Sequence, residues 1–97
     1  MTPSILDHDV SVIVPAYHEE AVIASVVGRI HQAMQQTGRR YEVIVVDDGS
    51  ADATAQRARE AGARVITHPY NIGNGAAVKT GIRHARGDAL VMLDADG

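Results

Sequence analysis

The fold is decided by the stretch Tyr41-Glu-Val-Ile-Val-Val-Asp-Asp-Gly-Ser50. Its apolar side chains occupy neighbouring positions, so a strand here is buried on both faces, which is typical of a parallel sheet covered by helices. The turn that starts at Asp47 follows directly, and Ser50 or Asp52 can cap a short helix after it. Strand, polar turn and helix in this order predict one unit of an α/β fold.

The same alternation continues in both directions along the chain. A β-branched run ends near Pro15, which cannot donate in a strand ladder, and apolar residues at helical spacing follow it. The predicted strands are Val10–Val14, Tyr41–Val46, Ala63–Thr67 and Ala89–Leu93, and the predicted helices lie within 21–38, 50–61 and 75–84. We expect an open parallel sheet with helices on both faces, with Val78, Ile82 and Ala85 facing inward from the third helix. Residues 1–9 are expected to be a flexible leader to a single unit, 10–97.

Composition and charge exclude several classes of protein. The chain has 97 residues, of which 45% are apolar and 22% are charged, and its net charge is −3. This mild acidity argues against a nucleic-acid-binding module. The absence of cysteine excludes a disulfide scaffold and a cysteine nucleophile, and it fits a reducing compartment. The apolar runs are far shorter than the ~20 residues of a membrane span, and no signal peptide is visible, so we expect a cytoplasmic protein.

Acidic residues follow three of the four predicted strands. In open α/β sheets, ligands bind beyond the carboxyl ends of the strands, so these acids are expected at one rim. In an extended chain, Asp94 and Asp96 point the same way with Cα atoms ~6.5–7 Å apart. That spacing suits Mg²⁺ or Mn²⁺ with a diphosphate, although an ordinary polar strand end has the same pattern. Of Asp47 and Asp48, one can cap the helix while the other accepts from a base or ribose, but turn chemistry alone also accounts for both.

The remaining candidates each have a structural alternative. Gly73-Asn-Gly75 ahead of a helix could bring backbone N–H groups to a phosphate, or could be a tight turn. Lys79, the only lysine, could reach an anionic group or remain solvated. Tyr17 could lie against a base or pack on the first helix, and one of Glu19 and Glu20 could serve only a helix N-terminus. The histidines at 8, 31, 68 and 84 have no paired spacing and are interpreted as surface or loop residues.

Four segments in this order resemble the successive motifs of family 2 glycosyltransferases: 12–20, 45–54, 71–77 and 93–97. The branch that they resemble most is the polyprenol-phosphate (dolichol-phosphate) mannose or glucose synthases. The resemblance implies a GT-A fold whose first, Rossmann-like half binds a UDP-sugar or a GDP-sugar. Right-handed crossovers and that family's topology give the strand order 3-2-1-4. The one departure within the motifs is His18, where the family usually has asparagine.

Site residues follow from the resemblance position by position. The nucleotide would contact Pro15, Ala16, Tyr17 and Glu19, while Asp48 would accept from the base and Asp47 would support the turn. Asp94 and Asp96 would hold Mg²⁺ or Mn²⁺ against the diphosphate, with Ala95 giving a backbone contact. Asp96 would thus contribute to catalysis through the metal. Gly75 and Lys79 complete the nucleotide-sugar-binding set that we predict.

The family's domain is longer than this chain. We therefore expect only the donor-binding half, without the general base and the site for a lipid-phosphate acceptor, and no transfer by the chain alone. The complete enzyme would work at the cytoplasmic face of the membrane. A noncatalytic nucleotide-binding or assembly module is the alternative, and a Mg²⁺-binding receiver domain is a weaker one, because its acidic pair should follow the first strand. The fourth strand would be an exposed apolar edge, which predicts a homodimer.

Overall fold

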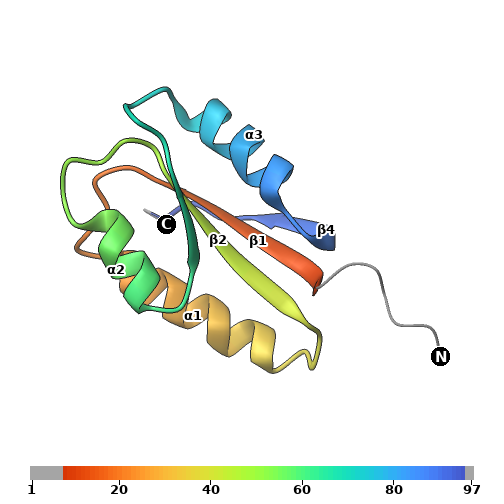
Figure 1. Cartoon of the computed structure of the whole chain (residues 1–97). Coiled ribbons are helices and arrows are strands. Elements are labelled where there is room, and N and C mark those ends of the chain that lie inside the picture. Colours follow the sequence, from red (N-terminus) through yellow and green to blue (C-terminus); the bar gives the residue numbers. More distant parts are fainter. Residues whose placement is uncertain (1–7, 96–97) are drawn as a thin grey trace.

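A computed structural model of the chain describes residues 8–95. Strands and helices alternate in it: β1 (His8–Ala16), α1 (Ile23–Gln35), β2 (Tyr41–Asp47), α2 (Thr54–Glu60), β3 (Arg64–Thr67), α3 (Asn74–His84) and β4 (Gly87–Met92). The four strands pair in parallel in the order β3-β2-β1-β4, which confirms the predicted sheet. Figure 1 shows α1 and α2 on one face of the sheet and α3 on the other.

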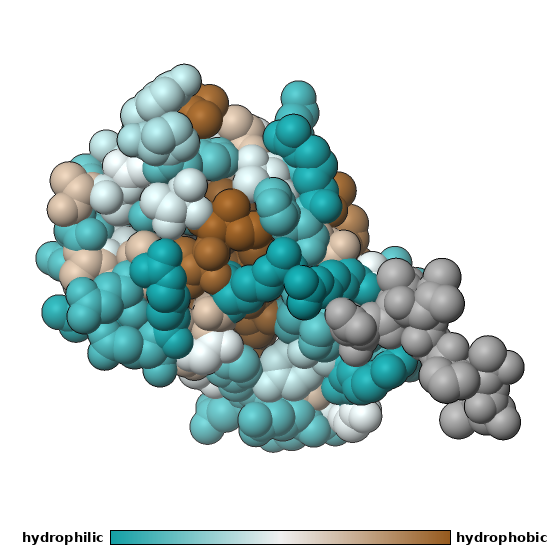
Figure 2. All heavy atoms as spheres, in the orientation of Figure 1, coloured by the Kyte–Doolittle hydropathy of each residue, from teal (hydrophilic) through white to brown (hydrophobic). Residues whose placement is uncertain are grey.

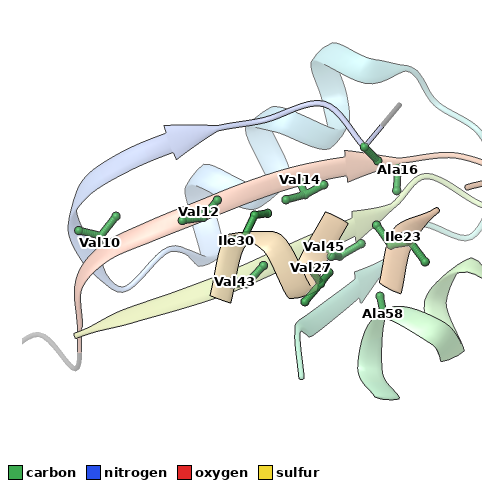
Figure 3. Close-up of a cluster of buried hydrophobic side chains, with 11 residues drawn as sticks. Val10, Val12, Val14, Ala16, Ile23, Val27, Ile30, Val43, Val45 and Ala58 are labelled. Carbon is green, nitrogen blue, oxygen red and sulfur yellow. The ribbon is translucent and has the colours of Figure 1, made fainter. Parts of the chain in front are cut away.

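The larger core lies between the sheet and the α1–α2 layer. Alternate residues of the two central strands, such as Val12 and Val45, point to this side and meet Ile23 and Val27 of α1 (Figure 3). The intervening residues, such as Ile44, point to the other face and are equally buried. Both faces of β2 are therefore buried, as its continuous apolar sequence predicted.

The face of α3 that packs on the sheet differs from our prediction. Ala77, Thr80 and Gly81 are buried, whereas Ile82 is 42% exposed and points outward. The reason is close packing: a Cβ at Gly81 would lie 2.4 Å from Cγ2 of Ile13. Small residues therefore bring α3 against β1. Of the predicted inward residues, Ala85 does pack, partly buried, against the core of this face.

A buried carboxylate ties the strands together at the end of the sheet where β2 and β4 begin. Glu42 accepts hydrogen bonds from Ser11 Oγ at 2.6 Å, from the backbone N–H of Arg86 at 2.6 Å and from Arg64 at 3.3 Å. Ser11 Oγ in turn accepts from the N–H of Gly87 at 2.8 Å. Burial raises the pKa of Glu42, but these donors outweigh it and hold the pKa below its ordinary value.

The two edges of the sheet are apolar and partly open. Figure 2 shows hydrophobic residues at the surface between α3 and the α1–α2 layer, on the side where β3 passes in front of β2 in Figure 1. At the opposite edge, β4 leaves Leu90 and Val91 each 40% exposed and Met92 51% exposed. An apolar groove of about 340 Å³ runs between β4 and α1. The exposed fourth strand that we expected is thus present.

The first strand starts earlier than predicted. β1 begins at His8, which pairs with Gly87 of β4, and Asp9 donates its N–H to the carbonyl of Arg40. His8 and Asp9 therefore belong to the sheet rather than to the expected leader. The remainder of that leader, residues 1–7, lies outside the described residues.

Candidate functional site

A cleft of about 480 Å³ opens at the carboxyl ends of β1, β2 and β4. It lies where the strand order reverses, with β2 on one side of β1 and β4 on the other, which is the usual ligand position in open α/β sheets. The predicted residues that line it are Pro15, Ala16, Tyr17, Glu19, Asp48, Asp94 and Ala95. The structure adds four residues that we had not assigned to the site individually: Asn71, Gly73, Asn74 and Ala77.

Two predicted residues are not in the lining of this cleft. Gly75 and Lys79 lie on α3 and are exposed, but neither borders the cleft. Asp96 lies outside the described residues. The structure therefore describes only Asp94 of the predicted metal-binding pair.

The floor of the cleft begins where the β1–β4 ladder ends. The last pair in that ladder is Ile13 with Met92, and the N–H of Leu93 donates to the carbonyl of Ile13 at 3.0 Å. Pro15 lies two residues beyond Ile13, so its backbone nitrogen faces the same side of β1 as the Ile13 carbonyl. The ladder with β4 has already ended there, so the N–H that proline lacks removes no hydrogen bond from the sheet. Its backbone instead borders open space, which a ligand can occupy.

The loop after β1 presents an exposed aromatic ring. Tyr17 is 43% exposed, and its ring stacks on that of His18 with centroids 4.0 Å apart. His18 has a φ of +53°, in the left-handed region that asparagine adopts more readily than most residues. Its N–H donates to Ser50 Oγ, and its Nε2 accepts from the N–H of Ala51. His18 therefore joins the loops after β1 and β2 and supports Tyr17 from one side.

The two glutamates of this loop have different roles. Glu20 accepts the N–H of Ala53 at 2.9 Å, so it caps α2 rather than its own helix. Asp52, one of the two predicted caps, accepts the N–H and the hydroxyl of Thr54, and the hydroxyl bond helps to hold the pKa of Asp52 below its ordinary value. Glu19 contributes its N–H to Thr54 Oγ1 and lines the cleft.

Asp47 and Asp48 also divide their tasks. Asp47 Oδ1 accepts the N–H of Ser50 at 3.1 Å and so closes the turn. Gly49 has a φ of +77°, and a Cβ there would lie 2.3 Å from the carbonyl carbon of Tyr70. The turn after β2 is thus pressed directly against the loop after β3, and only glycine fits at this position.

The Asp48 carboxylate is only 3% exposed and accepts four hydrogen bonds. Oδ1 accepts from His68 Nδ1 at 2.7 Å and from the N–H of Ile72 at 3.0 Å. Oδ2 accepts from Asn71 Nδ2 at 3.0 Å and from the N–H of Gly73 at 2.8 Å. Burial raises the pKa of Asp48, but these donors outweigh it and hold the pKa below its ordinary value. Both oxygens use the acceptor directions that a carboxylate has, so Asp48 organises the 71–73 loop.

His68, which we interpreted from the sequence as a surface or loop histidine, does lie in the loop after β3 but is buried rather than at the surface. It is 8% exposed, its Nδ1–H donates to Asp48, and its Nε2 lies 2.8 Å from Thr80 Oγ1 of α3. Its backbone N–H also donates to the carbonyl of Asp47, one step beyond the β2–β3 ladder. The strand order could have predicted the contact between His68 and Asp48, because β3 lies next to β2 and a residue that follows β3 therefore lies beside one that follows β2.

The N-terminus of α3 opens onto the cleft. Its first intrahelical bond runs from the N–H of Ala77 to the carbonyl of Gly73, so the N–H groups of the three residues between them have no partner within the helix. Gly73, with a φ of +136°, and Asn74 both line the cleft. Such a helix start attracts anions through its N–H groups and its dipole.

A divalent cation would meet one exposed carboxylate at the edge of the cleft. Asp94 is exposed and borders the cleft, so it offers one hard oxygen ligand of the kind that Mg²⁺ and Mn²⁺ prefer. Within residues 8–95, no three histidine, cysteine or acidic side chains come together as a metal site. The described residues therefore fit a cation that takes few protein ligands and completes its shell with a bound diphosphate and water.

Residues 11–97 match the family model named Glycosyl transferase family 2. This chain belongs to glycosyl transferase family 2. The resemblance that the four motifs suggested is thereby confirmed.

Two curated relatives of this family 2 chain act on polyprenyl phosphates by name. The undecaprenyl-phosphate 4-deoxy-4-formamido-L-arabinose transferase of Pseudomonas fluorescens is 38% identical over 96 residues, which cover 92% of this chain and 28% of the relative. The dolichyl-phosphate beta-glucosyltransferase of Trichomonas vaginalis is 40% identical over 100 residues, which cover 91% of this chain and 30% of the relative. The chain thus spans less than a third of the length of either relative.

The fold is shared with solved GT-A glycosyltransferases. The glucosyl-3-phosphoglycerate synthase of Mycobacterium tuberculosis, in complex with Mn²⁺, UDP-glucose and phosphoglyceric acid, has a TM-score of 0.77 and 34% identity. The match covers 91% of this chain and 33% of that one. The same synthase has also been solved with Mg²⁺ and UDP. In the described part of our chain, no helix combines the length and hydropathy that a membrane span requires.

Proposed function

We propose that this family 2 chain binds the nucleotide-sugar donor of a metal-dependent hexosyltransferase whose acceptor is a polyprenyl phosphate. The observation that carries the proposal is the cleft. It brings motif residues from the loops after β1, β2 and β4 together with the N-terminus of α3. The exposed ring of Tyr17 and the buried carboxylate of Asp48 match a base. The N–H groups at the start of α3 match the diphosphate, and the exposed carboxylate of Asp94 matches a cation.

The base lies against Tyr17 and near Asp48. The ring of Tyr17 is exposed, lines the cleft and is backed by His18, which supports a stacking role. Asp48 has no acceptor direction free, so a base N–H reaches Oδ2 only when the Asn71 amide gives up its bond. Asn71 is exposed and borders the cleft, so it is the partner that can be replaced at least cost.

The diphosphate lies between the start of α3 and the end of β4. The N–H of Asn74, which borders the cleft, faces phosphate oxygens, and Ala95 contributes a backbone contact. Gly75 and Lys79 do not border the cleft, so they are proposed to act on the diphosphate only through the N-terminal dipole and the positive charge of α3. Asp94 and Asp96 hold the cation. When bound, Mg²⁺ or Mn²⁺ neutralises the charge that builds on the departing nucleoside diphosphate. Pro15, Ala16 and Glu19 close the cleft from the β1 side.

We propose that the acceptor site and the general base belong to the part of the complete enzyme that corresponds to the region of the relatives not matched by this chain. The chain alone is therefore expected to transfer no sugar to a lipid phosphate, because positioning the attacking group supplies much of the rate. The complete enzyme is proposed to work at the cytoplasmic face of a membrane, which the absence of cysteine fits.

The second candidate is a noncatalytic nucleotide-binding or assembly module, which the exposed apolar edge of β4 favours. Such a module could keep the cleft without any transfer. Assembly is also proposed for the present chain, as a homodimer in which β4 pairs with β4 of a second copy. The exposed apolar side chains of that edge, which no lysine or proline interrupts, support this pairing.

Calorimetric titration with UDP and with GDP, each with Mn²⁺, tests the proposal. We expect one nucleotide to bind and Asp96→Ala or Asp94→Ala to weaken its affinity strongly, because the cation that offsets the diphosphate charge would then lose a carboxylate ligand. Asp88→Ala is the matched control, since Asp88 is an exposed aspartate at the start of β4, away from the cleft. Unchanged affinity in Asp96→Ala would refute the metal assignment, and the absence of any nucleotide binding would refute the proposed function.

A further inference from the structure

The loop that forms one wall of the cleft contains no helix or strand. Residues 68–73 join β3 to α3; within them, Asn71 and Gly73 line the cleft and Ile72 is 50% exposed. Their hydrogen bonds run to Asp48, which accepts from two backbone N–H groups and from one side-chain amide of this loop. The position of the wall therefore depends on the position of one carboxylate.

That carboxylate is in turn oriented by the buried side chain of His68, the first residue of the same connection, which does not itself line the cleft. His68 Nδ1 and Asp48 Oδ1 are 2.7 Å apart, and both side chains are at least 90% buried. The ring of His68 is fixed at its other end, because Nε2 lies 2.8 Å from Thr80 Oγ1. A carboxylate can only accept, so Nδ1 carries the proton toward Asp48.

We infer that His68 is a positioning residue of the donor site, which sets the cleft wall by holding Asp48 from behind. The inference rests on the proposed function and adds to it a residue that does not line the cleft. His68 matters most when a base donor replaces Asn71 at Oδ2, because Oδ1 then has to stay in place. Without the bond from Nδ1, the carboxylate can rotate and release the N–H groups of Ile72 and Gly73.

Two substitutions separate the two ends of the ring. In His68→Asn, the amide nitrogen stands at the same number of bonds from Cα as Nδ1, so the bond to Asp48 is kept and the bond to Thr80 is lost. In His68→Gln, the amide group stands where Nε2 was and its oxygen can accept the Thr80 hydroxyl as Nε2 does, so Thr80 is kept and Asp48 is left without this donor. Ser11→Ala serves as a control for general destabilisation, because Ser11 is buried in the Glu42 network at the other end of the sheet.

The full chain is tested by titration with UDP and Mn²⁺ and with GDP and Mn²⁺, and by amide hydrogen exchange at Ile72 and Gly73. We expect His68→Gln to weaken nucleotide affinity by about tenfold and to speed exchange at both amides, in line with the loss of one bond to a charged group. His68→Asn should stay within about threefold of the wild type in affinity, and Ser11→Ala should leave both readouts unchanged at equal loss of stability.

Wild-type nucleotide affinity in His68→Gln would overturn the inference. Equal losses of affinity in His68→Asn and His68→Gln would also overturn it, because they would point to packing of the ring instead. If the wild type binds neither nucleotide, the proposed function fails. Hydrogen exchange still decides the inference in that case: unchanged exchange in His68→Gln refutes it, and faster exchange there but not in His68→Asn supports it.

Discussion

Replacing Asp48 with asparagine removes one of the two oxygens that hold the loop after β3. The carboxylate accepts four hydrogen bonds, two at each oxygen, and an amide keeps only one acceptor oxygen. Two donors would then face an NH₂ group in a site that is only 3% exposed. A bond to a charged group contributes ~1.5–3 kcal/mol, so we expect Asp48→Asn to lower the free energy of unfolding by about 3 to 5 kcal/mol.

The adjacent aspartate provides the matched control. Asp47 is equally buried but accepts only the N–H of Ser50 among the hydrogen bonds described, and an amide oxygen can accept that bond as well. Asp47→Asn should therefore cost less than about 1 kcal/mol. Urea denaturation followed by circular dichroism, at pH 7 and 25 °C, measures both. A cost below about 1 kcal/mol for Asp48→Asn, or equal costs for the two variants, would refute the assignment of the four bonds.

Three further predictions concern the turn, the buried carboxylates and the sheet edge. Gly49→Ala should lower the free energy of unfolding by more than ~2 kcal/mol, because the added Cβ meets the Tyr70 backbone. Gly75→Ala, with open space around the added Cβ, should stabilise α3 by up to ~1 kcal/mol. The denaturation midpoints of the two variants test this contrast. The pKa values of Glu42 and Asp48 lie below their ordinary 4.5 and 3.8, so both carboxylates stabilise the fold above these values. A denaturation series should show the free energy of unfolding falling as the pH drops below 4.5 and 3.8. A flat profile there would contradict the hydrogen bonding of these carboxylates. Met92→Lys should convert the proposed dimer to a monomer in light scattering, while Ile82→Lys, also exposed but on α3, should not; a monomeric wild type would refute the edge pairing.

Much of the fold could be predicted because its signals are local. Continuous apolar runs bounded by turn residues marked β2 and its neighbours, and alternation of strands and helices implied parallel pairing. The misplaced parts depend on contacts between elements. The inward face of α3 is set by the fit of Gly81 on Ile13, which hydrophobic spacing alone does not reveal. His8 joins β1 because β4 and Arg40 lie beside it, and a polar His-Asp pair carries no strand signal of its own.

The candidate site divides in the same way. Residues that lie directly after a strand, such as Tyr17, Asp48 and Asp94, could be placed at the rim from the strand order alone. The partners of Asp48 could not, because they come from a loop whose path depends on the positive φ values at Gly49 and Gly73. A lone histidine after β3 has no motif, and its role becomes visible only when β3 is placed against β2.

The cleft between β1, β2, β4 and α3 is proposed to hold a nucleoside diphosphate. Chemical-shift mapping of the ¹⁵N-labelled chain with UDP or GDP and Mg²⁺ tests it most directly. We predict saturable shifts at Tyr17, Gly73, Asn74 and Ala95, with none at Ser11 or Glu42 at the other end of the sheet. An unchanged spectrum with both nucleotides, or shifts centred on Glu42, would contradict the account.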